Sequence, residues 1–320
     1  MLANGAQAAV TAMPGRPMFH QEVHCVRVLV LGGEGMLGHQ VCRRLRDRFE
    51  VWATYREDPA PWLRYGDVAP ERALGDVDAM DFATVAAALD VVRPAAVINC
   101  IGIVKQRDEA QMAVPSITIN SLLPHRLADA CGALDARLLH VTTDCVFSGA
   151  KGSYTEEDVP DPLDLYGRSK LLGEVDRDGC LSIRTSIIGW EVMASASLLE
   201  WFAGQRGRTV KGFTRSIYSG LSTIDLADTM GWLLEEHPDL SGLYQVASEP
   251  IDKCRLLEML RDAIRWHDIT IVPDDSFFCD RSLVAARFAA ATGWRSPSWE
   301  DMIVRLAEAW PTYATWRGFE

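Results

Sequence analysis

Three side chains near the middle of this sequence could together deliver a proton to a carbonyl oxygen. Thr143 comes after residues 137–141, which read as a buried strand, and Tyr166 and Lys170 follow Asp164 in a segment that reads as a helix. On a helix, residues four apart lie one turn apart on the same face. A free phenol ionises near about pH 10, and we expect the neighbouring ammonium to lower that pKa. Thr143, Tyr166 and Lys170 are therefore the candidate catalytic residues for reduction of a ketone.

A Tyr-x-x-x-Lys pair occurs by chance in many helical proteins, so its interpretation depends on the sequence before it. Residues 26–31 form a short run that is apolar except for Arg27, and residues 32–38 read Gly-Gly-Glu-Gly-Met-Leu-Gly. Apolar residues then recur every four positions from Leu37 to Phe49, as expected for a helix. Strand, glycine turn and helix in this order predict a dinucleotide site, because the glycines let the backbone approach a pyrophosphate at the helix N-terminus.

The residue after the second expected strand, residues 50–55, bears on the choice of dinucleotide. An acidic residue there would bind the 2′-hydroxyl of NAD, but Arg56 comes first and Glu57 and Asp58 follow it. A guanidinium can instead pair with a 2′-phosphate. The sequence thus favours NADPH, with NADH as the alternative, and an exposed Arg56 without function is the competing interpretation.

The remaining pattern predicts an α/β fold with a doubly wound parallel (Rossmann) sheet and a smaller, mixed C-terminal substrate-binding region. Strands and helices alternate regularly as far as a sixth strand at residues 181–184, and the rhythm loosens beyond Trp190. We expect a disordered tail at residues 1–23 and a dinucleotide-binding domain at 24–186. A substrate-binding region at 187–320 would partly return to the sheet, with helices near 198–203, 226–234 and 256–264 and strands near 243–246 and 270–272.

Composition excludes several classes of protein. The 320 residues carry a net charge of −12 and no Lys/Arg-rich run, which argues against nucleic acid, and the basic residues 43–48 fit a solvated helix face. There is no apolar run of the ~20 residues that span a membrane, nor a secretory signal at the start. The eight cysteines and seven histidines are scattered, so we expect no disulfide framework and no metal site. These features predict a cytoplasmic protein.

Several motifs together resemble the extended short-chain dehydrogenase/reductases, and among them the dTDP-4-dehydrorhamnose reductase family. The resemblance runs from about residue 26 to the mid-290s and is strongest in the first half. The motifs that carry it include the glycine turn, Val97-Ile98-Asn99, the expected helix with Asn120 and Pro124, Thr143-Asp144-x-Val146-Phe147-x-Gly149, Tyr166-Gly167-x-Ser169-Lys170, Gly173-Glu174, Arg184-Thr185-Ser186 and Arg281-Ser282-Leu283.

The resemblance implies Thr143, Tyr166 and Lys170 as the reductase triad, with Lys170 also holding the nicotinamide ribose. For the cofactor it adds Gly32, Gly35, Met36, Leu37, Asp76 and Val77, and the expected strand end at Cys100, Ile101 and Gly102 would face the same ligand. A nucleotide-sugar substrate would need local positive charge in this acidic protein. The candidate substrate-binding residues are Val104, Asp144, Lys211, Arg215 and Arg281.

Two departures from the family pattern concern the substrate. Cys145 stands where the family usually has Tyr, and Ile187-Ile188 replaces an aromatic substrate-facing segment. Related 4,6-dehydratases use an Asp-Glu pair after the Thr, and no Glu follows Asp144 here. The leading interpretation is an NADPH-dependent 4-ketoreductase of a nucleotide-linked deoxysugar. The alternatives are a non-catalytic regulatory subunit resembling the methionine adenosyltransferase β-subunit and a nucleotide-sugar epimerase, and a homodimer is compatible with each.

Overall fold

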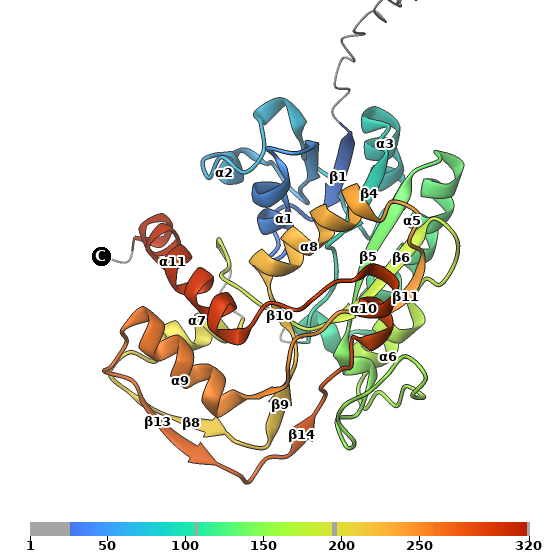
Figure 1. Ribbon diagram of the computed structural model, residues 1–320. Helices are drawn as coiled ribbons and strands as arrows, with labels where there is room; N and C mark the ends of the chain where they lie inside the picture. Colours follow the sequence, from blue (N-terminus) through green and yellow to red (C-terminus); the bar gives the residue numbers. More distant parts are fainter. Residues whose placement is uncertain (1–25, 106–107, 194–196, 319–320) are drawn as a thin grey trace, which may run out of the picture.

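The computed structural model describes residues 26–105, 108–193 and 197–318 of the chain, and the tail expected at residues 1–23 lies outside them (Figure 1). The strands are β1 (Arg27–Leu31), β2 (Glu50–Thr54), β3 (Ala73–Leu74), β4 (Ala96–Asn99), β5 (Arg137–Thr143), β6 (Cys180–Thr185), β7 (Ile187–Ile188), β8 (Thr209–Phe213), β9 (Ser216–Tyr218), β10 (Leu221–Ser222), β11 (Gly242–Gln245), β12 (Ile251–Asp252), β13 (Thr270–Asp274) and β14 (Cys279–Asp280).

The helices are α1 (Gly38–Leu45), α2 (Ala60–Leu63), η1 (Pro70–Arg72), α3 (Phe82–Val92), η2 (Asp108–Gln111), α4 (Ala113–Ser116), the π-helical η3 (Ile117–Leu122), α5 (Leu123–Ala133), η4 (Asp144–Val146), α6 (Leu165–Leu172), α7 (Leu198–Ala203), α8 (Thr223–Glu236), α9 (Lys253–Ile264), α10 (Ala286–Thr292) and α11 (Trp299–Arg317).

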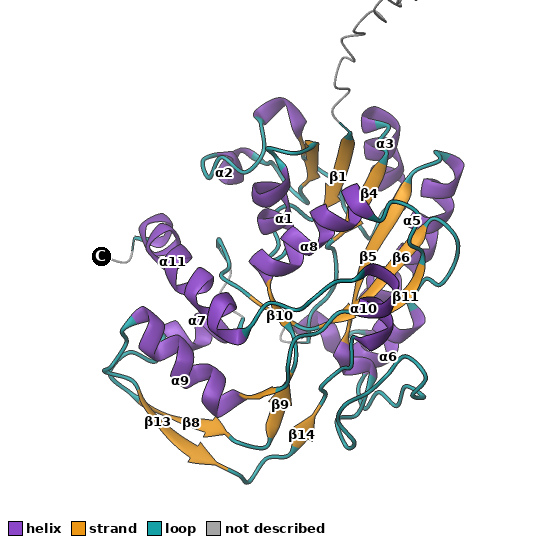
Figure 2. Cartoon of the chain, viewed as in Figure 1, coloured by secondary structure: helices purple, strands orange, loops and turns teal. Residues whose placement is uncertain are grey.

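A seven-stranded parallel sheet forms the centre of the molecule, in the order β11-β6-β5-β4-β1-β2-β3 (Figures 1 and 2). Neighbouring strands are joined by crossovers, so the carboxyl ends of β1, β4 and β5 meet at one edge. The predicted doubly wound parallel fold is confirmed. The strand expected near residues 243–246 is β11, which joins this sheet at its β6 edge.

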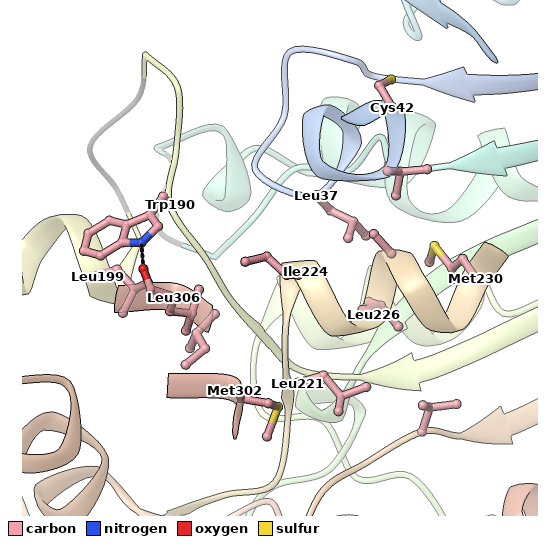
Figure 3. Close-up of a cluster of buried hydrophobic side chains, with 14 of the residues drawn as sticks. Leu37, Cys42, Trp190, Leu199, Leu221, Ile224, Leu226, Met230, Met302 and Leu306 are labelled. Atoms are coloured by element: carbon pink, nitrogen blue, oxygen red, sulfur yellow. Dashed lines mark hydrogen bonds between the residues drawn. The ribbon is translucent and has the colours of Figure 1, made fainter. Parts of the chain in front are cut away.

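Helices cover both faces of the sheet, as the alternation within β1 illustrates. Val28 and Val30 point into a core with α1 and α8, whereas Leu29 and Leu31 pack against α3 and α5. All four side chains are fully buried. Such a strand, buried on both faces, requires the continuous apolar run seen in the sequence. Figure 3 shows the first of these cores, where Leu37 of the glycine turn lies above Ile224 and Leu226 of α8.

The basic residues 43–48 form a largely exposed face, as the sequence suggested, and they also make ion pairs. Arg43 pairs with Asp67 at 2.8 Å, Arg44 with Asp228 at 2.7 Å, and Arg48 with Glu235. The last two carboxylates belong to α8, which packs along α1. Arg44 and Arg48 therefore join α1 and the turn after it to α8, almost two hundred residues away in the chain.

Several boundaries differ from the sequence expectations. The sequence predicts a helix at residues 120–131, but helical winding begins earlier, at Ala113, and passes through the π-helical turn η3. The sequence also predicts a third strand that ends at residues 75–77, whereas β3 ends at Leu74. Helices α10 and α11 were not predicted.

Among the described residues, no helix is both long and apolar enough to cross a bilayer.

The C-terminal half builds small sheets beside the carboxyl edge of the large one. β9 lies between β12 and β14, β8 pairs with β13, and β10 pairs with β7, which follows directly from β6. In Figure 1 these strands and α9 lie below the carboxyl end of the sheet. They supply a second wall for any ligand bound at that edge.

A buried ion pair fixes the end of α6 against the sheet. Arg184 of β6 donates from Nε and Nη2 to the two oxygens of Glu174, each at 2.7 Å. Only 4% of the Arg184 side chain and 8% of the Glu174 side chain are exposed. The Thr142 hydroxyl of β5 also donates to this carboxylate, at 3.3 Å. Glu174 therefore connects the segment after α6 to two central strands.

We predict that Arg184→Met lowers the free energy of unfolding by about 3–5 kcal/mol, because it leaves the Glu174 carboxylate buried without its partner. The matched control is the double variant Arg184→Met/Glu174→Leu, which removes both charges and should recover most of the loss. Urea denaturation at pH 7 measures both values. Equal destabilisation in the single and double variants would show that packing, and not charge pairing, fixes this position.

Candidate active site

Strand β5 ends at Thr143, whose hydroxyl organises the residues that follow. Its Oγ1 accepts a hydrogen bond from the Cys145 N–H at 3.1 Å and donates to Asp144 Oδ1 at 3.2 Å. This cap starts the short helix η4, and it leaves Thr143 buried at the carboxyl edge of the sheet. Ligands of open parallel sheets bind at that edge.

Helix α6 presents Tyr166 and Lys170 one turn apart, as predicted from their spacing. Asp164 caps the helix by accepting the Gly167 N–H at 2.8 Å. Asp164 also pairs with Lys105 at 2.7 Å, which ties the start of α6 to the segment after β4. The cap explains why the helix begins where it does, because the first N–H groups of a helix need an acceptor.

Two glycines allow α6 to lie unusually close to its neighbours. A Cβ added to Gly167 would sit 2.3 Å from the Cys145 carbonyl oxygen, and one added to Gly173 would sit 1.9 Å from the Asn120 carbonyl oxygen. Both positions face backbone, which cannot move aside as a flexible side chain can. Any larger residue at 167 would therefore separate Tyr166 from the end of β5.

Asn120 joins the loop after β4 to α6. Its Nδ2 donates to the Ile103 carbonyl at 3.1 Å and to Ser169 Oγ at 3.2 Å, while its Oδ1 accepts the Ile103 N–H at 2.9 Å. Asn120 lies in the π-helical turn η3 and is buried. Single π-helical turns are frequent at functional sites because they redirect a side chain. Sequence patterns gave no role to this residue.

The Lys170 ammonium is buried and donates to the Val141 carbonyl at 2.7 Å. Burial lowers the pKa of Lys170 to about 8, although the nearby Glu174 carboxylate opposes this shift. The amine therefore remains mostly protonated at pH 7. Gly102 faces it, since an added Cβ there would lie 3.9 Å from Lys170 Nζ. Glycine at 102 keeps the ammonium accessible from the loop after β4.

Tyr166 is half-buried in the cavity wall, and the desolvation of its phenol reverses the expected direction of its pKa shift. Burial raises the pKa, the neighbouring Cys145 and Asp144 raise it further, and hydrogen bonding by Thr143 opposes them. We expected Lys170 to lower this pKa, but burial dominates. The phenol is thus held in its protonated form at neutral pH, as a proton donor must be.

The glycine turn after β1 has the geometry of a backbone cradle. Gly32 adopts φ = +83°, a conformation that strongly favours glycine. A Cβ on Gly38 would lie 2.0 Å from the Gly32 carbonyl oxygen, so α1 can begin this close to β1 only with glycine there. The Thr54 carbonyl accepts the Gly33 N–H at 2.9 Å and links the turn to β2.

One cavity of about 560 Å³ lies between the glycine turn, the ends of β4 and β5, α6 and the C-terminal segments. This volume is typical of small-molecule sites. The structure brings most of the predicted residues to its wall: Gly35, Met36, Leu37, Cys100, Ile101, Gly102, Val104, Thr143, Asp144, Tyr166, Lys170 and Arg281.

Four predicted cofactor residues do not line this cavity. Gly32 shapes the turn from behind, and Val77 is buried with its N–H donating to the Tyr55 carbonyl at 3.0 Å. Asp76 has φ = +57°, and Arg56 is exposed. The Arg56 N–H donates to Glu34 Oε1 at 3.3 Å, so a carboxylate from the glycine turn also lies at this end of the site.

Two predicted substrate-binding residues lie away from the cavity. Lys211 points outward from β8, where its ammonium pairs with Asp274 at 2.7 Å and 69% of its side chain is exposed. Arg215 is exposed, with its guanidinium 5.0 Å from the centre of the Phe278 ring. The sequence pattern suggested that residues 211–222 form a loop over the carboxyl edge of the sheet. The segment instead forms β8 and β9, and the strand alternation turns Lys211 to solvent.

Comparison with protein families decides what kind of chain this is. Residues 26–188, half of the sequence, match the model of the RmlD substrate binding domain. The chain belongs to the RmlD substrate binding domain family. This membership confirms the resemblance to the extended short-chain reductases given above. The matched residues include the glycine turn and every residue of the triad.

Individual relatives of this RmlD-family chain carry different names. A probable low-salt glycan biosynthesis reductase from Haloferax volcanii is 28% identical over 309 residues, covering 89% of this chain and 99% of the relative. A dTDP-4-dehydrorhamnose reductase from Streptomyces griseus is 32% identical, and methionine adenosyltransferase 2 subunit beta from Xenopus tropicalis is 28% identical. Each of these two matches covers 46% of this chain, and they cover 43% and 41% of the respective relatives.

The fold is also that of a solved reductase. The crystal structure of dTDP-4-dehydrorhamnose reductase from Bacillus anthracis, in complex with NADP, superposes with a TM-score of 0.72. The alignment covers 88% of this chain and 98% of that chain at 20% identity. At this identity the likeness establishes the fold alone.

Sequence reasoning missed several side chains that line the cavity of this RmlD-family chain. Lys253 opens α9 and has no ion pair among the described residues. Tyr218 ends β9, and its buried hydroxyl makes no hydrogen bond within the described part of the chain. Burial raises its pKa, and nearby Asp144 adds to this shift. Neither residue lies in a recognisable motif, so only the fold could identify them.

Lys170 gives the site a measurable pH dependence. The pKa of Lys170 is about 8 in the folded protein, and its ordinary value is 10.5. At pH values between these two, the unfolded chain therefore binds more protons than the folded protein. Stability from this group therefore rises with pH. We predict that wild type gains about 2 kcal/mol between pH 7 and pH 9.5 relative to Lys170→Met, which lacks the titration. Urea denaturation at each pH measures both free energies of unfolding. If wild type and Lys170→Met changed equally with pH, the burial of this charge would be contradicted.

Proposed function

We propose that this chain is an NADPH-dependent reductase of the 4-keto group of a nucleotide-linked deoxysugar, with Tyr166 as the general acid. The observation that carries the proposal is the meeting of Thr143, Tyr166 and Lys170 with the glycine turn in one cavity. Membership of the RmlD family, and the reductase names of two relatives, support an oxidoreductase acting on a sugar nucleotide.

The residues present fit a nicotinamide dinucleotide. Gly35, Met36 and Leu37 offer backbone to a pyrophosphate at the start of α1, where the helix dipole favours negative charge. Gly102 leaves room beside the Lys170 ammonium for a ribose. When bound, the nicotinamide supplies the hydride for the carbonyl carbon. Arg56 and the carboxylate of Glu34 would then face the adenosine end, where the choice between NADPH and NADH is made.

The chain's own groups supply the proton. Tyr166 donates its phenolic hydrogen to the substrate carbonyl oxygen as that oxygen becomes an alkoxide, and solvent later restores the phenol. Its raised pKa favours the protonated state from which it must act. Thr143 orients the phenol and the substrate oxygen. Lys170 remains mostly charged at pH 7, so its field stabilises the phenolate left after proton transfer.

The surroundings of Cys145 argue against a dehydratase. Burial raises the pKa of the Cys145 thiol to about 12, and the nearby Asp144 raises it further. A neutral thiol is a poor base for removing a carbon-bound proton. An epimerase would use the same triad but return its dinucleotide unchanged. Oxidation of one NADPH for each product molecule therefore separates the proposed reductase from that alternative and from a non-catalytic subunit.

The defining experiment is a panel of nucleotide-linked 4-ketosugars, followed by loss of NADPH absorbance. We predict that Tyr166→Phe lowers kcat by ~10²–10⁴-fold, because the proton donor is lost, while the Kd for NADPH stays within about threefold of wild type. Tyr218→Phe is the comparison variant: it removes another phenol of the same cavity, and it should keep its kcat at saturating substrate because that phenol is not the proton donor. If Tyr166→Phe turned over at the wild-type rate, Tyr166 would not be the acid.

The substrate diphosphate provides a second test. Arg281 lines the cavity, and its Nε donates to the Phe147 carbonyl at 2.9 Å, which leaves the other nitrogens of the guanidinium to face a ligand. We predict that Arg281→Ala weakens nucleotide-sugar binding about ten- to a hundredfold, the value of one or two charge-assisted hydrogen bonds. NADPH affinity should change much less.

Lys211→Ala and Arg215→Ala serve as matched controls, because each removes one positive charge outside the cavity. Both should keep wild-type substrate affinity in calorimetric titration. A loss of affinity in all three variants would mean that net charge, and not contact at Arg281, governs binding.

A further inference from the structure

The C-terminal helix α11 reaches both walls of the cavity without lining it. Figure 1 shows α11 in red beside α7 and α9, with α1 on its other side. Its Leu306 carbonyl accepts a hydrogen bond from Trp190 Nε1 at 2.8 Å, drawn as a dashed line in Figure 3. Trp190 follows the cavity residues Ile187 and Ile188. Further along the helix, Tyr313 and Arg317 each contact a different wall.

Tyr313 connects α11 to the glycine turn through a chain of buried hydrogen bonds. Gln40 Nε2 can only donate, and it lies 2.6 Å from the Tyr313 hydroxyl. That hydroxyl must then give its own hydrogen to His39 Nε2, also at 2.6 Å. His39 consequently carries its hydrogen on Nδ1, which donates to the Gly35 carbonyl at 2.8 Å.

Burial supports this assignment of hydrogens. Tyr313 is completely buried, and His39 and Gln40 are 2% and 3% exposed. Burial also lowers the pKa of His39 to about 4, so the imidazole is neutral and can accept at one nitrogen while it donates at the other. The chain ends on Gly35, a residue of the cavity wall where we place the dinucleotide.

Arg317 connects the same helix to the opposite wall. Its guanidinium pairs with both oxygens of Glu200 in α7 and donates to the Glu191 carbonyl. Only 12% of the Arg317 side chain and 6% of the Glu200 side chain are exposed. Glu200 Oε1 also accepts the Glu191 N–H at 2.9 Å. Glu191 lines the cavity, together with Ser197 and Leu198 at the start of α7.

We propose that Tyr313 and Arg317 are positioning residues through which α11 sets the dinucleotide turn and the substrate wall separately. The two lie one helical turn apart, and the Arg317 guanidinium is 5.6 Å from the centre of the Tyr313 ring. Tyr313 acts on cofactor affinity through His39 and Gly35. Arg317 acts on substrate affinity through Glu200 and Glu191. The assignment of ligands to the two walls rests on the proposed function.

The test compares Tyr313→Phe with Arg317→Met by two measurements. Tyr313→Phe keeps the buried ring but leaves His39 and Gln40 without the hydroxyl, so the Kd for NADPH, measured by fluorescence titration, should rise about five- to tenfold. Its KM for the nucleotide sugar should change less than twofold. Arg317→Met should do the reverse: it should raise the KM for the nucleotide sugar and change the Kd for NADPH less than twofold. Arg317→Lys, which keeps the charge, should recover part of the lost substrate affinity.

Arg305→Met is the matched control on the same helix. Arg305 pairs with Asp225 of α8 at 2.7 Å, away from the cavity, so this variant should lower Tm without changing either constant. The proposal is overturned if Tyr313→Phe leaves the NADPH Kd within twofold of wild type, or if Arg305→Met shifts both constants as strongly. If the wild-type protein did not bind NADPH at all, the proposed function would be overturned as well. If the wild type binds NADPH, a negative result in the variants contradicts only the role proposed for α11.

Discussion

Burial of charge beneath the carboxyl edge of the sheet is the constraint on which this structure depends. Lys170, Glu174 and Arg184 are all buried within two neighbouring strands and the end of one helix. A buried charge is tolerated only where its partners have good geometry. Arg184 and Glu174 satisfy each other through two short hydrogen bonds, while Lys170 relies on the Val141 carbonyl. The position of α6, and with it Tyr166, follows from satisfying these groups together.

The same constraint explains the close contacts around α6. The ammonium of Lys170 can reach Val141 only if the helix lies nearly against the backbone of η4 and η3, and the glycines at 167 and 173 permit that approach. The low dielectric that makes Lys170 costly also strengthens its field on a phenolate. A reductase built this way gives up folding stability for a site that is already arranged before ligands bind.

Local signals explain what the sequence could predict, and long-range contacts explain what it could not. The glycine turn, the Asp164 cap and the Tyr166–Lys170 spacing each depend on a few neighbouring residues, so they could be predicted from the sequence. The order of the strands in the sheet could not be predicted in this way. Helix α11 could not, because its role rests on contacts such as Tyr313 with His39, 274 positions apart. Lys211 was misplaced for a similar reason: its charge was visible, but the strand that turns it to solvent was not recognised.

The two halves of the chain carry different parts of the proposed reaction. The family match ends at residue 188, and it contains the glycine turn and the triad. Tyr218, Lys253 and Arg281, which face them across the cavity, all come from beyond that point. Cys145 stands where the resemblance to the family led us to expect Tyr, while Tyr218 brings an unpaired buried hydroxyl to the same cavity from β9. Because an unpaired buried hydroxyl is costly unless a ligand satisfies it, the proposed selectivity for the sugar would depend on residues beyond the family match at 26–188.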